Sequence, residues 1–335
     1  MTATPLLLEV RHLTTTFPRP AGEVVAVDRL SLALRRGESL ALVGESGSGK
    51  SVTALSLMRL VMGGHISGHA WMDLGDGGPP RDLLALDERA MQKVRGRHLG
   101  MVFQEPMSSL NPLRSVGDQI AEVMRVHGLA TARQARFRAL ALMMQVGLPE
   151  PELRMGQFPH QLSGGMRQRV MIAMALAGNP ALLIADEPTT ALDVTVQAQI
   201  LRLLRQVQRS FGMGLLFVSH DLGVVAQVAD RVAVMYAGQV IESANVVELY
   251  ARPRHPYTRA LLAAVARPGM RSRLRGDAER PEPPEQPAQP GIGLPRCCRY
   301  IDHCPRVQTR CRQERPLLVG PESHAVRCFF PLEAA

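Results

Sequence analysis

A glycine-rich loop between two apolar segments constrains the fold of this chain most. Residues 39–43 (SLALV) predict a short buried strand, and residues 50–62 carry apolar side chains at helical spacing. Between them, residues 44–51 (GESGSGKS) match the phosphate-loop pattern completely. A strand that leads through such a loop into a helix is typical of parallel sheets covered by helices on both faces. We therefore expect an α/β fold.

The rest of the chain agrees with this fold. Strands are predicted at 6–10 and 24–34, at 181–185 and 215–219, and in a hairpin of 231–235 with 239–242. Helices are predicted at 115–148, interrupted at Gly128, and at 166–177 and 194–211. Strands and helices alternate, as they do in a mostly parallel sheet.

The loop chemistry points to a nucleotide. Glycines let successive backbone N–H groups curl around phosphate oxygens, and the following helix adds its positive end. Lys50 is expected to reach the β- and γ-phosphates, and the Ser51 hydroxyl to ligate magnesium. A chance glycine turn is the alternative, and the flanking strand and helix argue against it. We expect contacts to ATP from the whole loop: Gly44, Glu45, Ser46, Gly47, Ser48, Gly49, Lys50 and Ser51.

Two acidic residues follow the apolar segment 181–185. Asp186 and Glu187 then lie at the carboxyl end of a buried strand, where ligands bind in open α/β sheets. One carboxylate can hold magnesium, and the next can polarise an attacking water as a general base. Acidic residues also serve as helix caps, but the phosphate loop favours the catalytic interpretation.

A second glycine pair begins a later helix. Ser163, Gly164 and Gly165 precede the helix predicted at 166–177, and helix N-termini bind anions. An ordinary serine cap is the alternative. Gln104 and His220 follow two other predicted strands, so each could reach a γ-phosphate or its water. Taken alone, a histidine such as His220 more often has a structural role.

Together these motifs resemble the ATP-binding cassette (ABC) ATPases over about residues 6–250. The matching segments are Walker A at 44–51, the Q-loop at Gln104, the signature LSGGMRQR at 162–169, Walker B at 181–187, the D-loop at 191–193 and the H-loop at His220. The resemblance implies a RecA-like core, an antiparallel β subdomain and a helical signature subdomain. It also implies a head-to-tail dimer in which ATP lies between Walker A of one subunit and the signature of the other.

The resemblance assigns roles to single residues. Glu187 is the implied catalytic base, with His220 and Gln104 positioning water and the γ-phosphate. Magnesium ligands are Ser51, Gln104 and Asp186. The contacts from the second subunit are Ser163, Gly164, Gly165 and Gln168, and Asp193 lies at the interface. Phe17 is the candidate for stacking on adenine, and a residue in the core of a strand is its alternative.

A narrower resemblance concerns the importer ATPases for oligopeptides, dipeptides and nickel. It rests on residues 81–84 (RDLL), 103–112 (FQEPMSSLNP) and 255–262 (HPYTRALL) and on the C-terminal extension. It implies an ATP-hydrolysing subunit at the cytoplasmic face of the cell membrane, energising uptake of peptides or a similar small solute. Its implied partners are a second ATPase subunit, identical or related, two integral membrane permeases and, indirectly, a solute-binding protein.

All five cysteines lie between Cys297 and Cys328. Such clustering in a cytosolic chain suggests a metal or cluster site more than disulfides. Four thiolates suit zinc or iron–sulfur equally, and free thiols are the alternative. In the importer subfamily a similar set is thought to hold a [4Fe–4S] cluster, which would assign Cys298, Cys304, Cys311 and Cys328 as ligands. Cys297, where relatives often have glycine, leaves open which of the adjacent pair binds.

We expect three regions: an ABC ATPase domain at 1–265, a Pro-rich linker at 266–292 and a Cys-rich extension at 293–335. No apolar run is long enough to span a bilayer, and no secretory signal is evident. The net charge of +9 leaves open an ABC ATPase of a soluble complex, acting on nucleic acid or resembling the cassette of carbon–phosphorus lyase. The chain lacks the insertions or second cassette of the nucleic-acid types, so we expect no nucleic acid.

Overall fold

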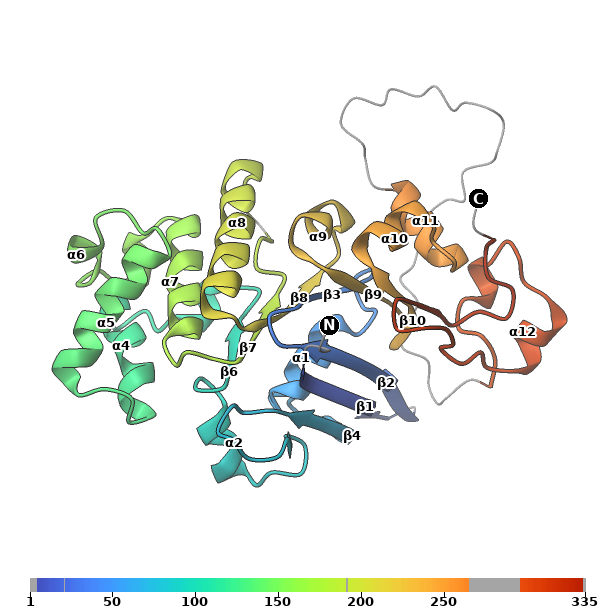
Figure 1. Ribbon diagram of the computed structural model, residues 1–335, viewed down its shortest axis with the longest axis horizontal. Helices are drawn as coiled ribbons and strands as arrows, with labels where there is room; N and C mark the ends of the chain where they lie inside the picture. Colours follow the sequence, from blue (N-terminus) through green and yellow to red (C-terminus); the bar gives the residue numbers. More distant parts are fainter. Residues whose placement is uncertain (1–4, 21, 191, 265–295, 334–335) are drawn as a thin grey trace.

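Two β-sheets organise the protein (Figure 1). The computed structural model describes residues 5–20, 22–190, 192–264 and 296–333. The predicted linker at 266–292 lies outside the described residues. Within them, no helix is both long enough and apolar enough to cross a membrane.

The larger sheet has seven strands in the order β11-β10-β9-β3-β8-β7-β6. Strands β6, β7, β8, β3 and β9 are parallel, and β10 and β11 add antiparallel at one edge. Their bounds are β3 (Ser39–Val43), β6 (Leu99–Val102), β7 (Leu182–Asp186), β8 (Gly214–Ser219), β9 (Arg231–Tyr236), β10 (Gln239–Asn245) and β11 (His324–Val326). The parallel strands are apolar except at their ends, because helices or the second sheet cover both of their faces.

The smaller sheet is antiparallel, in the order β2-β1-β4-β5. Its strands are β1 (Leu6–Arg19), β2 (Gly22–Arg35), β4 (His65–Met72) and β5 (Arg81–Asp82). Strand β1 is much longer than the predicted 6–10, because register shifts let it stay paired with β2 up to Arg19. It packs over α1 and one face of the larger sheet, forming a core that includes Leu13, Leu42 and Met235.

The helices divide into those that cover the larger sheet and those that form a subdomain at one end of it (Figure 1). The subdomain packs α4, α5 and α7 around Ile120, Ala139 and Ile172. The helices are α1 (Lys50–Leu57), α2 (Glu88–Val94), α3 (Pro106–Ser109), α4 (Val116–Val126), α5 (Ala132–Gln145), α6 (Pro151–Arg154), α7 (Gly164–Leu176), α8 (Val194–Phe211), α9 (Leu222–Val228), α10 (Val246–Ala251), α11 (Pro256–Ala264) and α12 (Thr309–Gln313), with 3-10 turns η1 (Pro159–Gln161) and η2 (Ile301–His303).

Two helix predictions differ from the structure. Helix α1 ends at Leu57 rather than near residue 62, because Arg59 adopts a left-handed conformation (φ 52°) that stops the helix. The long helix predicted over 115–148 is the pair α4 and α5, which turn at Gly128 (φ 65°), as the interruption indicated.

The C-terminal extension packs against the cassette at the sheet edge far from the helical subdomain (Figure 1). Strand β11 pairs with β10, and a buried ion-pair cluster joins the two parts. The Asp28 carboxylate, fully buried in β2, accepts hydrogen bonds from the guanidinium groups of Arg299 (2.7 Å) and Arg315. Removing one partner of such a buried pair costs about 3–5 kcal/mol, because it leaves a buried charge uncompensated.

Candidate functional site

The phosphate loop connects β3 to α1 and is shaped by close backbone contacts. Gly49 caps α1 with φ 103°, and a Cβ there would lie 2.4 Å from the carbonyl oxygen of Ala26. Only glycine fits this position without moving the backbone. The sequence GSGK therefore lets the loop pack closely against the β2 backbone.

Lys50 is buried within its own loop. Its ammonium donates to the carbonyl oxygens of Gly44 (2.9 Å) and Glu45 (2.8 Å), and the residue is 4% exposed. Burial lowers the pKa of Lys50, and the nearby carboxylates of Glu187 and Asp186 oppose that shift. A lysine has three N–H donors, so these two bonds leave one for a ligand.

Ser51 and Asp186 form a pair of oxygen ligands. The Ser51 hydroxyl donates to Oδ1 of Asp186 over 3.0 Å, at the junction of α1 and the end of β7. Asp186 is 5% exposed, and burial raises its pKa while the Ser51 hydrogen bond and Lys50 lower it. A hydroxyl beside a carboxylate fits Mg²⁺, which prefers oxygen ligands and offsets the charge of a buried carboxylate.

Glu187 is surrounded by polar groups from neighbouring strand ends. Its carboxylate lies 3.1 Å from Nδ1 of His220, after β8, and accepts from Nε2 of Gln104, after β6, over 3.4 Å. The Thr190 hydroxyl donates to it over 2.9 Å. The structure thus brings together three side chains predicted from separate parts of the sequence. Sequence reasoning missed Thr190, whose only signal is a hydroxyl three residues after the carboxylate.

The signature residues lie on the first turn of α7 and face a different neighbour. Ser163 caps the helix, accepting weakly from the backbone N–H of Met166 (3.4 Å). Gly164 and Gly165 lie beside Leu192 and Val196, close to where Asp193 caps α8 by accepting from the N–H of Val196 (2.9 Å). Among the described residues, no hydrogen bond or ion pair joins 163–165 to the phosphate loop. Ser163 and Gly164 are exposed.

Two predicted ATP contacts lie in other environments. Gln168 is 2% exposed, and its Nε2 has no hydrogen-bond partner. Because Gln168 lies on a buried face of α7, its side chain is not on the surface where it could contact ATP bound to a second subunit. Phe17 is half-buried in β1, and its ring lies against the loop that precedes β4, close to Gly64. Adenine stacking by Phe17 stays a prediction.

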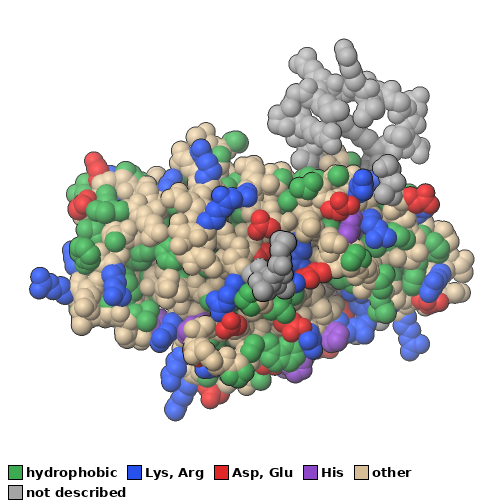
Figure 2. Space-filling model, in the orientation of Figure 1, with side chains coloured by type: hydrophobic (Ala, Val, Ile, Leu, Met, Phe, Trp, Pro, Cys, Tyr) green, Lys and Arg blue, Asp and Glu red, His purple; other side chains and the backbone are tan. Residues whose placement is uncertain are grey.

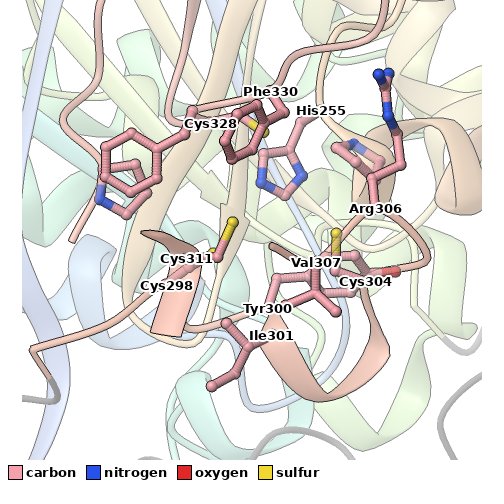
Figure 3. Close-up of a pocket in the computed structure, with 13 residues that line it drawn as sticks. His255, Cys298, Tyr300, Ile301, Cys304, Arg306, Val307, Cys311, Cys328 and Phe330 are labelled. Atoms are coloured by element: carbon pink, nitrogen blue, oxygen red, sulfur yellow. The ribbon is translucent and has the colours of Figure 1, made fainter. Parts of the chain in front are cut away.

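The four predicted cysteine ligands line one small cavity, together with His255, Tyr300 and Phe330 (Figure 3). Cys297 is not among the lining residues. Burial raises the pKa of Cys298 to about 11 and also raises those of Cys304 and Cys328. The cavity of ≈ 10 Å³ has room for about one water. Among the described residues, no group of three or more His, Cys, Asp or Glu side chains is arranged to hold a metal ion. The arrangement does not fit the expected cluster.

Comparison with known proteins agrees with this geometry. The family described as ABC transporter matches residues 27–190, and the oligopeptide/dipeptide transporter C-terminal region matches residues 241–311. A putative peptide import ATP-binding protein of Brucella ovis is 48% identical over 328 residues, covering 96% of each chain. The oligopeptide transport ATP-binding protein AppD of Bacillus subtilis is 45% identical over 329 residues, covering 97% of this chain and 96% of its own.

Among solved structures, the ATP-binding cassette MJ0796 in a dimeric post-hydrolysis state bound to ADP and Pi is similar, with a TM-score of 0.63 and 28% identity. The match covers 72% of this chain and 99% of that cassette. It confirms the predicted cassette fold. The chain belongs to the ABC transporter ATP-binding proteins, in the group that carries the oligopeptide/dipeptide C-terminal region, and its enzymatic activity is ATP hydrolysis coupled to transport.

Proposed function

We propose that this chain is the ATP-hydrolysing subunit of an importer for dipeptides or oligopeptides. One observation carries the catalytic part: the Glu187 carboxylate is held between Gln104 and His220 at the sheet edge that also bears Lys50 and the Ser51–Asp186 pair. The names of the relatives, peptide import and oligopeptide transport, support the substrate class.

Phosphate binding follows from the loop. Its N–H groups and the first turn of α1 offer donors to the phosphates, and the free N–H of Lys50 can reach the terminal phosphoryl group. Ser51 and Asp186 are the residues that would hold Mg²⁺, with Gln104 beside them. The ion, when bound, neutralises charge that develops on the phosphate oxygens.

Glu187 is the proposed general base. Its carboxylate accepts a proton from the attacking water, while His220 and Gln104 orient that water and Thr190 orients the carboxylate. The backbone of Glu187 has a positive φ of 43°, sparsely populated for a non-glycine residue. The hydrogen bond from its N–H to the carbonyl oxygen of Val218 (3.0 Å) supports this conformation.

A second ATPase subunit is the proposed partner for the signature residues. The exposed N-terminus of α7 offers orphan N–H groups to an anion. Among the described residues, the one side-chain hydrogen bond at this end is the Ser163 cap on the N–H of Met166. The related cassette MJ0796 is dimeric, which supports a pair of ATPase subunits. The head-to-tail arrangement with Asp193 at the interface is what the family resemblance implies. The second subunit is identical to this chain or a related ATPase.

We further propose a peripheral location at the cytoplasmic face of the membrane, on two permease subunits that receive solute from a binding protein. The rival, a soluble complex or a nucleic-acid ATPase, has less support. No relative named above acts on nucleic acid, and Lys and Arg side chains are dispersed over the face shown in Figure 2 rather than gathered in one stripe.

We propose separately that Cys298, Cys304, Cys311 and Cys328 are the ligand set of a [4Fe–4S] cluster in the loaded protein. Its support is that four thiols line one cavity, and a cluster would require the segments bearing them to move apart. Iron and acid-labile sulfide per chain should be measured after anaerobic purification, in the wild type and in Cys304→Ser, with Cys297→Ser as the control. A cluster predicts loss in the first variant only, and absence of iron from the wild type refutes it.

Transport is tested in cells that lack the gene for this chain. Uptake of a labelled oligopeptide should return with the wild-type gene and not with Glu187→Gln, and the tagged chain should co-purify with two integral membrane proteins. Normal peptide uptake in the deletion strain, or co-purification with soluble proteins alone, would contradict the proposal.

A further inference from the structure

The peptide groups of Glu45, second residue of the Walker A loop, are fixed on two sides. The Glu45 N–H donates to the hydroxyl of Tyr257 over 3.1 Å, and its carbonyl oxygen accepts from Lys50 Nζ over 2.8 Å. The Lys50 contact is internal to the loop. Tyr257 comes from α11, 212 positions later in the chain. An element outside the nucleotide motifs therefore holds the start of the loop.

Tyr257 is rigidly held. The residue is 2% exposed, and its backbone N–H donates to Nδ1 of His255 over 3.1 Å. Its ring packs on those of Tyr236 (centroids 4.7 Å apart) and Tyr300 (5.5 Å). Burial and then the charge of Glu45 raise the pKa of Tyr257, so the hydroxyl is neutral at physiological pH. A neutral hydroxyl in a fixed ring is a well-placed acceptor for one backbone N–H.

Tyr300 belongs to the C-terminal extension. Its ring lines the cysteine cavity with His255 and packs edge-on against Tyr257 and Tyr236. The neighbouring Arg299 fixes the segment by donating to Oδ2 of Asp28 and to the carbonyl oxygen of Ala237. Contacts therefore run without a break from the cysteine cavity through Tyr300 and Tyr257 to Glu45.

We propose that Tyr257 is a positioning residue for the Walker A loop and that Tyr300 supports it, so that the docked extension raises the affinity for ATP. This inference rests on the proposed binding of ATP phosphates by residues 44–51. Tyr257 acts on the loop backbone and touches no reacting atom, so its loss should alter ATP binding more than turnover at saturation.

The direct test is Tyr257→Phe, which removes only the hydroxyl. The loss of one neutral hydrogen bond predicts a rise of about two- to tenfold in the Kd for ATP, with kcat at saturating ATP within about twofold of wild type. Tyr250→Phe is the matched control, because Tyr250 is another largely buried tyrosine whose hydroxyl donates to the carbonyl oxygen of Leu222, on α9. It should leave the Kd unchanged.

Tyr300→Leu tests the support from the extension and should also raise the Kd for ATP. Tyr300→Phe keeps the ring and should leave that Kd unchanged.

Lys50→Ala is the reference variant, because it tests whether the loop binds ATP at all. If Lys50→Ala leaves ATP binding intact, the proposed function of the loop fails. If Lys50→Ala abolishes binding but Tyr257→Phe and Tyr300→Leu, folded by their melting curves, bind ATP like wild type, only the present inference is overturned.

Discussion

The two phosphate-binding parts of this chain are built differently. In the Walker half, buried charged groups have partners from the same chain: Lys50 has two loop carbonyls, Asp186 has Ser51, and Glu187 has Gln104 and His220. In the signature half, Ser163 and Gly164 lie exposed and Gly165 part-buried at the N-terminus of α7, and the side chain of Ser163 only caps the helix.

The difference follows from the cost of desolvation. A buried charge without a partner costs several kcal/mol, so the Walker half must be complete within one chain. The first N–H groups of a helix can remain hydrated until an anion replaces water. The Walker half can therefore bind nucleotide within a single chain. The signature half remains hydrated on the surface until it meets nucleotide bound to a second chain. The following variants test that contrast.

The largest effect is expected for Glu187→Gln. Removing a general base should lower turnover by about 10²–10⁴-fold, while the loop still binds ATP, so ATP-bound dimer should accumulate. Steady-state hydrolysis and light scattering with ATP measure the two effects. Exposed Glu152→Gln is the control, and normal turnover in Glu187→Gln would show that another group is the base.

Ser163→Ala probes the signature half. The loss of a charge-assisted hydrogen bond to phosphate should lower turnover by about 10–100-fold and leave the Kd for ATP of the isolated chain unchanged. Ser115→Ala removes an equivalent cap from α4, so both variants should lose about 1 kcal/mol of stability, and only Ser163→Ala should lose turnover. Equal turnover in the two variants would reduce Ser163 to a structural cap.

A paired glycine experiment compares the halves directly. Gly49→Ala would place its Cβ 2.4 Å from a backbone oxygen, with strain of about 1–3 kcal/mol that should weaken ATP binding roughly 5- to 100-fold. In Gly165→Ala the near atom is Cγ1 of Val196, a side chain that can rotate, so ATP binding should change by less than about twofold. Calorimetric titration with ATP measures both. Equal losses would remove the distinction between the halves.

The smallest effect expected is on the pH dependence of stability, through His255. This residue accepts a hydrogen bond from the N–H of Tyr257, which in turn contacts the phosphate loop. Burial lowers its pKa to about 3, so the neutral ring stabilises the fold above the unfolded pKa of 6.5, and this contribution is lost as pH falls from 6.5 toward 3. The loss should be about 1.4 kcal/mol per pH unit within that window. Urea unfolding at pH 7.5 and 5.5 should show it in wild type and in the exposed-site control His160→Gln, but not in His255→Gln. The same slope in all three would contradict this assignment.

The fold and the grouping of the Walker half were predictable from the sequence because both depend on local patterns. Apolar strands that end in the phosphate loop, at Asp186, or shortly before Gln104 and His220 place these groups at one sheet edge. The burial of Gln168 was not predictable, because it depends on how α7 packs in the helical subdomain. Nor was the Tyr257–Glu45 hydrogen bond, since no local signal marks a contact between residues 212 positions apart. The clustering of the cysteines predicted a metal or cluster site, and it did not reveal the size of the cavity that four of them line.

The central claim is that hydrolysis needs a second chain, whereas ATP binding does not. The most direct measurement is ATP turnover per chain as the purified protein is diluted, with light scattering to report its mass and a parallel titration of ATP affinity. We expect turnover per chain to fall toward zero as the protein becomes monomeric, while the Kd for ATP is unchanged. Constant turnover per chain in a solution of monomers would contradict it.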